Sequence, residues 1–391
     1  MNKNSCILHG CDIYDSDYET FVHGAILIED GKFARVMRTD DISLFPEGVK
    51  KIDMTGKYVI PGLVDVHTHG RAGYDFNTAP AEKYDEIALS YARTGTTTLM
   101  PTLASATLES LECSTAAIAA RKNIPGTAAF AGVHLEGRYL SPKKRGAHAP
   151  ELLSDPSAAE IRRFREIAPD TRMRLSMAPE LPGGDDMIRA ARELGVVVTA
   201  AHTDADFAQL SHAVALGVTG FTHTFNAMRP IHHRDPGGAG AALLFDECYA
   251  EFICDGHHIA PEIIKLSWRA KAPDRFVLIT DSMEAAGCPD GEYSIAGLPV
   301  FVRDGLAVNN EGALAGSTLD LFTALKNFMK FCGLSLEEAL PSATSNPARM
   351  IGAADECGSI RDGARADFIV ISDKDDPVIE SVVAAGETVE L

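Results

Sequence analysis

The middle of the chain alternates short apolar segments rich in β-forming residues with longer segments of helical periodicity. This alternation is typical of βα units, in which helices connect the parallel strands of one sheet. The candidate strands are residues 63–69, 96–100, 128–135, 173–178, 196–201, 218–223, 249–255 and 276–281. The candidate helices are 81–93, 157–167, 185–194, 204–216 and 260–271, followed by 335–351, where Ser335 and Glu338 have the spacing of a capping box. Eight such strands predict an α/β fold of the (β/α)8, TIM-like barrel type.

The two ends of the chain have a different pattern. Both contain short apolar segments separated by turn signals, such as Asp30-Gly31 near the N-terminus and Asp362-Gly363 near the C-terminus. Two β-rich ends around one long central unit predict a small β-sandwich domain that both termini build together. The predicted boundaries are 1–60 and 353–391 for this domain and 61–352 for the barrel.

Charge and composition exclude several classes of partner. The formal net charge is −19, and such an acidic surface repels the phosphates of nucleic acids and anionic lipids, so neither is an expected partner. No segment approaches the roughly 18 consecutive apolar residues of a membrane span, and the first residues lack the apolar core of a secretory signal. The eight cysteines form no CxxC pair, which is typical of reduced thiols. We therefore expect a cytoplasmic protein.

Ionisable side chains occur at the ends of several predicted strands. His67 and His69 lie two residues apart and therefore on the same face of the first strand. Other strands end in Glu136, His202, His223 and Asp281. Because the carboxyl ends of barrel strands meet at one rim, we expect these groups to lie close together, and burying them without a cation would be costly. Imidazole and carboxylate groups bind zinc and iron, so the pattern predicts a divalent metal site.

Asp281 has a separate predicted role. A metal lowers the pKa of bound water to about 7, and a nearby carboxylate can take the proton of that water and return one to the leaving group. We therefore predict that Asp281 acts as general base and acid. The structural alternatives are a carboxylate that holds a loop for Asp281, and a pair of hydrogen-bonded core histidines for His67 and His69.

Longer motifs accompany these strand ends. They are PGLVDVHTHG (61–70), HLEG (134–137), AHT (201–203), THTFNAM (222–228), HHRDPG (232–237), DGHH (255–258), TDSM (280–283) and LAGSTLD (314–320). The strand-end set resembles that of the amidohydrolase superfamily, and the longer motifs resemble, within it, the family of N-acetylglucosamine-6-phosphate deacetylases. The resemblance covers most of the chain in the same order, including the divided β domain.

This resemblance implies a reaction and a set of contacts. The reaction is hydrolysis of the acetamide of N-acetyl-D-glucosamine 6-phosphate by metal-activated hydroxide, yielding D-glucosamine 6-phosphate and acetate. A homodimer is implied, with one or two divalent metals per subunit, zinc or iron above all. Glu136, His202 and His223 would hold the principal metal, and His67 and His69 a second one. The other implied contacts are His148 for the acetamide carbonyl, Asn226, Ala227 and Arg234 for the phosphate, and His258 for the sugar or phosphate.

Several alternatives stay open at this level. The substrate could be N-acetylgalactosamine 6-phosphate, or the barrel could bind a sugar phosphate without catalysis. Arg234 could act in its own subunit's site or in that of a partner. HLEG is followed by Arg138-Tyr139, whereas the family usually has proline and an aromatic residue there. An arginine at this position either adds positive charge beside the ligand or closes the pocket.

Overall fold

A parallel barrel forms the centre of the molecule, in a computed structural model that describes residues 5–391. Its strands are β6 (Leu63–Thr68), β9 (Thr96–Ala104), β11 (Val133–Glu136), β12 (Met173–Met177), β13 (Val197–Ala200), β14 (Val218–Phe221), β15 (Tyr249–Ile253) and β16 (Phe276–Ile279). Each pairs in parallel with its neighbour in this order. The barrel closes between its last and first strands: just after β16, the Asp281 N–H donates to the carbonyl of His67 on β6 over 3.0 Å. The predicted TIM-like barrel is confirmed.

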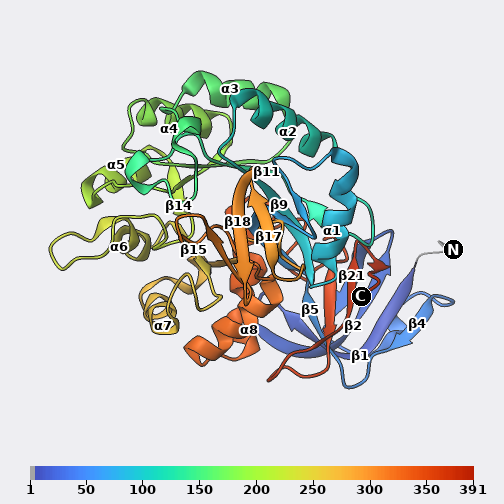
Figure 1. The fold of residues 1–391 in the computed structure, drawn as a ribbon. Helices are drawn as coiled ribbons and strands as arrows, with labels where there is room; N and C mark the ends of the chain where they lie inside the picture. The colour runs from blue at the N-terminus through green and yellow to red at the C-terminus, as the bar shows by residue number, and fades with distance from the viewer. Residues whose placement is uncertain (1–4) are drawn as a thin grey trace.

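Helices surround this barrel (Figure 1). They are α1 (Tyr84–Ala92), α2 (Leu108–Ala120), α3 (Ala158–Ile167), α4 (Gly184–Glu193), α5 (Phe207–Leu216), α6 (Gly237–Leu244), α7 (Pro261–Ala270) and α8 (Leu321–Cys332). All predicted helices between the strands are confirmed; α2, α6 and α8 are additional. The sequence GGAGAALL of α6 does not indicate a helix, because glycine has low helix propensity. Among the described residues no helix combines the length and apolar character needed to span a membrane.

The segment 335–351 is helical but interrupted. Ser335 and Glu338 form the predicted capping box, with each side chain accepting from the other's backbone N–H. Helix α9 (Leu336–Ala339) passes into a 3₁₀ turn (Leu340–Ala343) at Pro341, and α10 (Ser345–Met350) follows. Proline cannot donate the backbone hydrogen bond of a continuous α-helix, which explains the break. Other 3₁₀ turns lie at Ile42–Leu44, Ala81–Lys83, Pro142–Lys144, Pro150–Leu152 and Pro273–Arg275.

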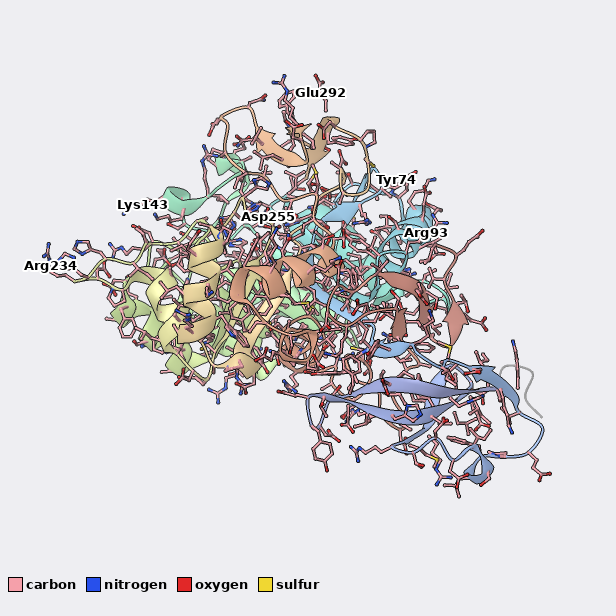
Figure 2. The ribbon with its side chains drawn as sticks, turned by 90° about the horizontal axis from the view of Figure 1, so that it is seen from below. Tyr74, Arg93, Lys143, Arg234, Asp255 and Glu292 are labelled. Carbon is pink, nitrogen blue, oxygen red and sulfur yellow. The ribbon has the colours of Figure 1, made fainter. Side chains whose placement is uncertain are left out.

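Both chain ends build one β-sheet beside the barrel (Figure 2). The described strands are β1 (Cys6–Asp15), β2 (Thr20–Glu29), β3 (Lys32–Met37), β4 (Lys50–Asp53), β5 (Tyr58–Pro61), β20 (Phe368–Ile371), β21 (Ile379–Ala384) and β22 (Glu387–Thr388). Strand β5 pairs antiparallel with β20, which joins the two ends. The predicted small β domain from both termini is therefore confirmed. Its boundaries at 60 and 352 stay a prediction, and residues 1–4 lie outside the described part.

A three-stranded meander follows the barrel, and the sequence pattern did not indicate it. Its strands are β17 (Gly291–Ile295), β18 (Leu298–Arg303) and β19 (Leu306–Asn309), connected by turns at Gly297 and Gly305 where φ is positive. Figure 1 shows it in orange across the barrel. It packs through an apolar cluster that includes Met283, two residues after Asp281, and Ala147, next to His148. The meander therefore covers two loops that carry predicted site residues. Short pairings complete the fold at β7 (Gly70–Arg71), β8 (Tyr74–Asp75) and β10 (Ala129–Phe130).

Candidate metal centre and active site

Six predicted side chains converge at the carboxyl ends of five barrel strands. His67 and His69 come from the end of β6, Glu136 ends β11, and the others directly follow β13, β14 and β16, as His202, His223 and Asp281. All six residues are buried. Strand geometry and barrel closure alone bring them together, because they lie up to 214 residues apart in sequence.

Glu136 lies at the centre of this group and uses its two carboxylate oxygens differently. Its Oε2 is 3.3 Å from His67 Nε2 and 3.0 Å from His69 Nε2. Asp281 Oδ1 closes the same group, at 3.4 Å and 3.2 Å from these two nitrogens. We call His67 and His69, with Glu136 Oε2, the first ligand group, and Asp281 Oδ1 contacts both of its histidines.

The other oxygen of Glu136 faces a second pair of histidines. Its Oε1 is 2.9 Å from His223 Nε2 and 3.4 Å from His202 Nε2. The two imidazole Nε2 atoms lie 3.1 Å apart. We call His202 and His223, with Glu136 Oε1, the second ligand group. Glu136 thus bridges two adjacent sets of donor atoms.

The donor atoms fit a divalent metal. His67, His69 and Asp281 offer ligand atoms within 4.8 Å of one another, and so do Glu136, His148 and His202. Two imidazole nitrogens lie 3.4 Å apart in the first group and 3.1 Å apart in the second, and one cation can take the lone pairs of both nitrogens of a pair. Nitrogen and carboxylate donors suit zinc and iron. The chemistry and spacing of these residues therefore fit one metal in each group.

The pKa values of the metal-free cluster also agree with a cation site. Burial disfavours a protonated His69, but the hydrogen bonds that it donates to the Asp281 and Glu136 carboxylates raise its pKa to about 9. The carboxylates likewise hold the pKa of His67 well above its usual value, against the effect of burial. Burial favours a protonated Glu136, yet the facing histidines keep its pKa well below the usual range. The cluster therefore retains positive charge as protons, which a cation would displace.

The backbone at these strand ends is unusual. His202, His223 and Asp281 have φ values of 43°, 30° and 49°, in the left-handed region that L-residues rarely adopt. Each such residue costs on the order of 1–3 kcal/mol, and such residues cluster at functional sites. At each of these positions the chain turns the side chain into the cluster: His202 and His223 face Glu136, and Asp281 faces His67 and His69.

His148 lies beside the second ligand group. Its ring centroid is 4.7 Å from that of His202, with the rings nearly perpendicular at 85°. The backbone N–H of Ser105 donates to His148 Nδ1 over 3.4 Å, which leaves the proton on Nε2. Burial, with His202 second, lowers the pKa of His148 to about 3, so the ring is neutral. A neutral histidine with a proton on Nε2 can donate a hydrogen bond to a carbonyl oxygen.

The predicted substrate residues fall into two sets. Asn226 and Ala227 follow His223 in a tight loop, where Asn226 Nδ2 donates to the His223 carbonyl over 3.2 Å. His258 is held by Asp255, whose Oδ2 is 2.6 Å from His258 Nδ1. Arg234, by contrast, is exposed, and Figure 2 shows it at the edge of the molecule, far from Asp255. Within one subunit the structure therefore does not bring Arg234 to the metal centre.

Arg138, the departure from the family pattern, turns toward helix α3. Its guanidinium donates to the Ala106 carbonyl over 3.3 Å and lies 3.7 Å from Glu160 Oε2, which also accepts from the Tyr139 hydroxyl over 2.6 Å. The two effects considered for this arginine stay predictions. Lys143, in the loop that follows, is exposed and pairs with Asp204 over 3.1 Å.

Sequence reasoning missed two charged residues below the metal centre. Arg174 on β12 and Glu251 on β15 form a fully buried ion pair, and Glu251 Oε2 is 3.3 Å from His67 Nδ1. The signal in the sequence was one charged residue in each of two mostly apolar strand segments, MRLSM and YAEFI. His134 is a further buried residue of β11; its nitrogens bond to Thr102 and Ser176, and burial lowers its pKa, as in a neutral core histidine.

Comparison with known proteins agrees with this arrangement. A model of the amidohydrolase family matches residues 58–389. The N-acetylglucosamine-6-phosphate deacetylase of Vibrio furnissii is 34% identical over 316 residues, 80% of this chain and 79% of the relative. The N-acetylgalactosamine-6-phosphate deacetylase of Escherichia coli O157:H7 is 35% identical over 327 residues, 83% of this chain and 86% of the relative.

A solved structure extends the similarity to the whole fold. A variant of N-acetyl-D-glucosamine-6-phosphate deacetylase from Mycobacterium smegmatis, in complex with N-acetyl-D-glucosamine-6-phosphate, superposes with a TM-score of 0.89 at 32% identity. The match covers 99% of this chain and 100% of that chain. The family match over residues 58–389, the identities above 30% and the shared fold lead to one conclusion: the chain is an enzyme of the amidohydrolase family.

Proposed function

We propose that the protein hydrolyses the acetamide of N-acetyl-D-glucosamine 6-phosphate to D-glucosamine 6-phosphate and acetate, and that it needs a divalent metal. The observation that carries this proposal is the bridging position of Glu136 between two groups of histidines at the barrel rim. The activity of the relatives from Vibrio furnissii and Mycobacterium smegmatis supports the choice of substrate.

The metal ligands are assigned from the two groups. Glu136, His202 and His223 would hold the principal ion, and His67 and His69 a second one, with zinc or iron as the metal. When bound, such an ion polarises the amide carbonyl and lowers the pKa of water, so that hydroxide is available near neutral pH.

The protein's own side chains move the protons. Burial opposes ionisation of Asp281, but His67 and His69 lower its pKa to about 2, so it is a carboxylate at neutral pH. Asp281 takes a proton from the attacking water and then donates one to the departing amine nitrogen. His148 donates from Nε2 to the carbonyl oxygen, which stabilises the negative charge that develops there.

The phosphate would be bound across a dimer. Asn226 and Ala227 follow His223 of the second ligand group, while His258, in the loop after β15, pairs with Asp255. Arg234 would reach the phosphate of the partner subunit, since it extends away from its own metal centre (Figure 2). Ile231, in the same loop, is half exposed, and an interface would cover it. A planar guanidinium suits bidentate phosphate binding.

The experiment is an acetate-release assay on purified protein reconstituted with Zn²⁺ or Fe²⁺. The panel contains N-acetylglucosamine and N-acetylgalactosamine, each with and without 6-phosphate. We expect turnover of N-acetylglucosamine 6-phosphate and little turnover of the free sugars. Preference for the galactosamine isomer would move the assignment to the activity of the Escherichia coli relative. No acetate from either phosphate would contradict the proposal and favour a barrel that only binds sugar phosphates.

The cellular location is part of the same proposal. The eight cysteines, all within the described residues, are free thiols, and four of them are buried. Reduced thiols are the ordinary state in the cytoplasm, where we place the enzyme.

A further inference from the structure

The ion pair between Arg174 and Glu251 lies directly below the metal centre. Both side chains have no exposed surface, and Arg174 heads the fully buried side chains by volume. Desolvating two charges in this way offsets most of their attraction, so a buried ion pair is weak evidence for a contribution to stability. The contacts of the pair indicate a role in positioning the proposed metal ligands.

Each member of the pair contacts the metal ligands or their immediate neighbours. Glu251 Oε2 is 3.3 Å from His67 Nδ1 and accepts from the His223 backbone N–H over 3.2 Å. Arg174 donates to the carbonyl of Val66, beside His67, over 3.0 Å. It also donates to the hydroxyl of Thr222, beside His223, over 3.0 Å. The pair thus connects one histidine of each ligand group.

A carboxylate fixes which nitrogen of a histidine is available. Ionised Glu251 can only accept, so the contact requires a proton on His67 Nδ1. The Nε2 lone pair is then free to bind a metal, and Nε2 is the atom that faces Glu136 and Asp281 at 3.3 Å and 3.4 Å. In the second ligand group the corresponding contact of His202 Nδ1 is a neutral acceptor, the Lys144 carbonyl at 2.8 Å.

We propose that Glu251, oriented by Arg174, is a positioning residue that sets the tautomer and ring orientation of His67 and thereby the metal affinity of the first ligand group. This inference rests on the proposed function only in requiring that the cluster binds a metal. Outer partners of ligating histidines typically contribute 10- to 100-fold to metal affinity.

Two matched double variants isolate the acceptor. Removing either charge alone would leave the other buried and unpaired, which endangers folding. Arg174→Met/Glu251→Leu removes both charges and the acceptor. Arg174→Met/Glu251→Gln also removes both charges, but its amide oxygen can still accept from His67 Nδ1 and from the His223 N–H. Thr199→Val serves as control, because Thr199 bonds to Arg174 at 3.2 Å but contacts no ligand.

The measurement is Zn²⁺ binding to metal-free protein, in competition with a chromophoric chelator, with unfolding curves to verify each fold. We expect one binding step of the Leu variant to weaken by about 10- to 100-fold. The Gln variant and Thr199→Val should bind as the wild type does. If the wild-type protein binds Zn²⁺ in a single step, the affinity of that step is compared between the wild type and the variants.

Unchanged binding by the Leu variant, or equal weakening in the Gln variant, would overturn the inference. Should the Leu variant fail to fold, Glu251→Asp retains the charge but withdraws the acceptor, and unchanged Zn²⁺ affinity there would also overturn it. Because no substrate is used, the outcome is independent of the acetate assay: Glu251-dependent Zn²⁺ binding without acetate release would refute only the proposed function.

Discussion

The barrel rim and the terminal β-sheet place their charged groups in opposite ways. At the rim Glu136 is 2% exposed and faces four imidazoles, and three of the neighbouring residues have a strained backbone. In the sheet the core contains apolar side chains such as Ile26 and Phe33, while ion pairs such as Lys57–Glu380 stay about one-third exposed. The rim therefore gives up stability for binding and chemistry, whereas the sheet has the apolar core of a stabilising element.

The largest expected effect tests the rim. Asp281→Asn cannot accept the proton of water, so we expect kcat to fall by about 10²- to 10⁴-fold while metal content and the urea midpoint stay near wild type. Steady-state assays with elemental analysis measure both quantities. Loss of the metal in this variant would instead make Asp281 a ligand.

The next effect tests the sheet. Ile26→Ala leaves a cavity in the terminal core, and such truncations cost about 2–5 kcal/mol. We expect a lower urea midpoint but an unchanged kcat for the folded fraction. A matching loss of kcat would mean that the sheet and the rim are coupled, which would break the comparison.

The stability of the metal-free protein should depend on pH through the histidines of the rim. The pKa of His69 is about 9 in the fold, against about 6.5 in an unfolded chain. The folded state thus binds this proton more tightly, and the resulting stability is complete below about pH 6.5 and lost as pH rises toward 9. Zn²⁺ affinity should rise over the same interval, because metal binding requires the neutral imidazole. Urea midpoints of chelator-treated protein that stay constant from pH 6 to 9 would contradict this.

A smaller effect concerns the exposed loop. Arg234→Ala removes a hydrogen bond to a charged phosphate, which contributes about 1.5–3 kcal/mol, so KM should rise by about 10- to 100-fold with little change in kcat. Arg162→Ala is a matched control, because Arg162 forms an exposed pair with Glu193. An unchanged KM for Arg234→Ala would remove the phosphate role.

The smallest effect concerns Arg138. Its contacts with Glu160 and the Ala106 carbonyl lie outside the metal centre. Arg138→Ala should change the free energy of unfolding by about 1 kcal/mol or less and leave the ratio of turnover of the two sugar isomers unchanged. A change in that ratio would show that Arg138 affects substrate choice.

Much of the site could be predicted because strand geometry is local. Alternation along 63–69 places His67 and His69 on one face, and the barrel rule places Glu136 and Asp281 at the same rim. Helix α6 and the meander β17–β19 escaped prediction, because glycine-rich and turn-rich segments have weak local signals. Arg174 and Glu251 escaped as well, since a charge within an apolar strand does not reveal its partner on another strand.

The sequence by itself determined that five strands end in potential ligands and that a closed barrel would gather them. Only the tertiary structure decided how these groups share contacts: that Glu136 serves both ligand groups, that Arg138 turns toward α3, and that Arg234 points away from its own rim. The physical reason is that periodicity along one strand fixes a side chain's face, whereas its distance to groups on other strands depends on packing among segments far apart in the chain.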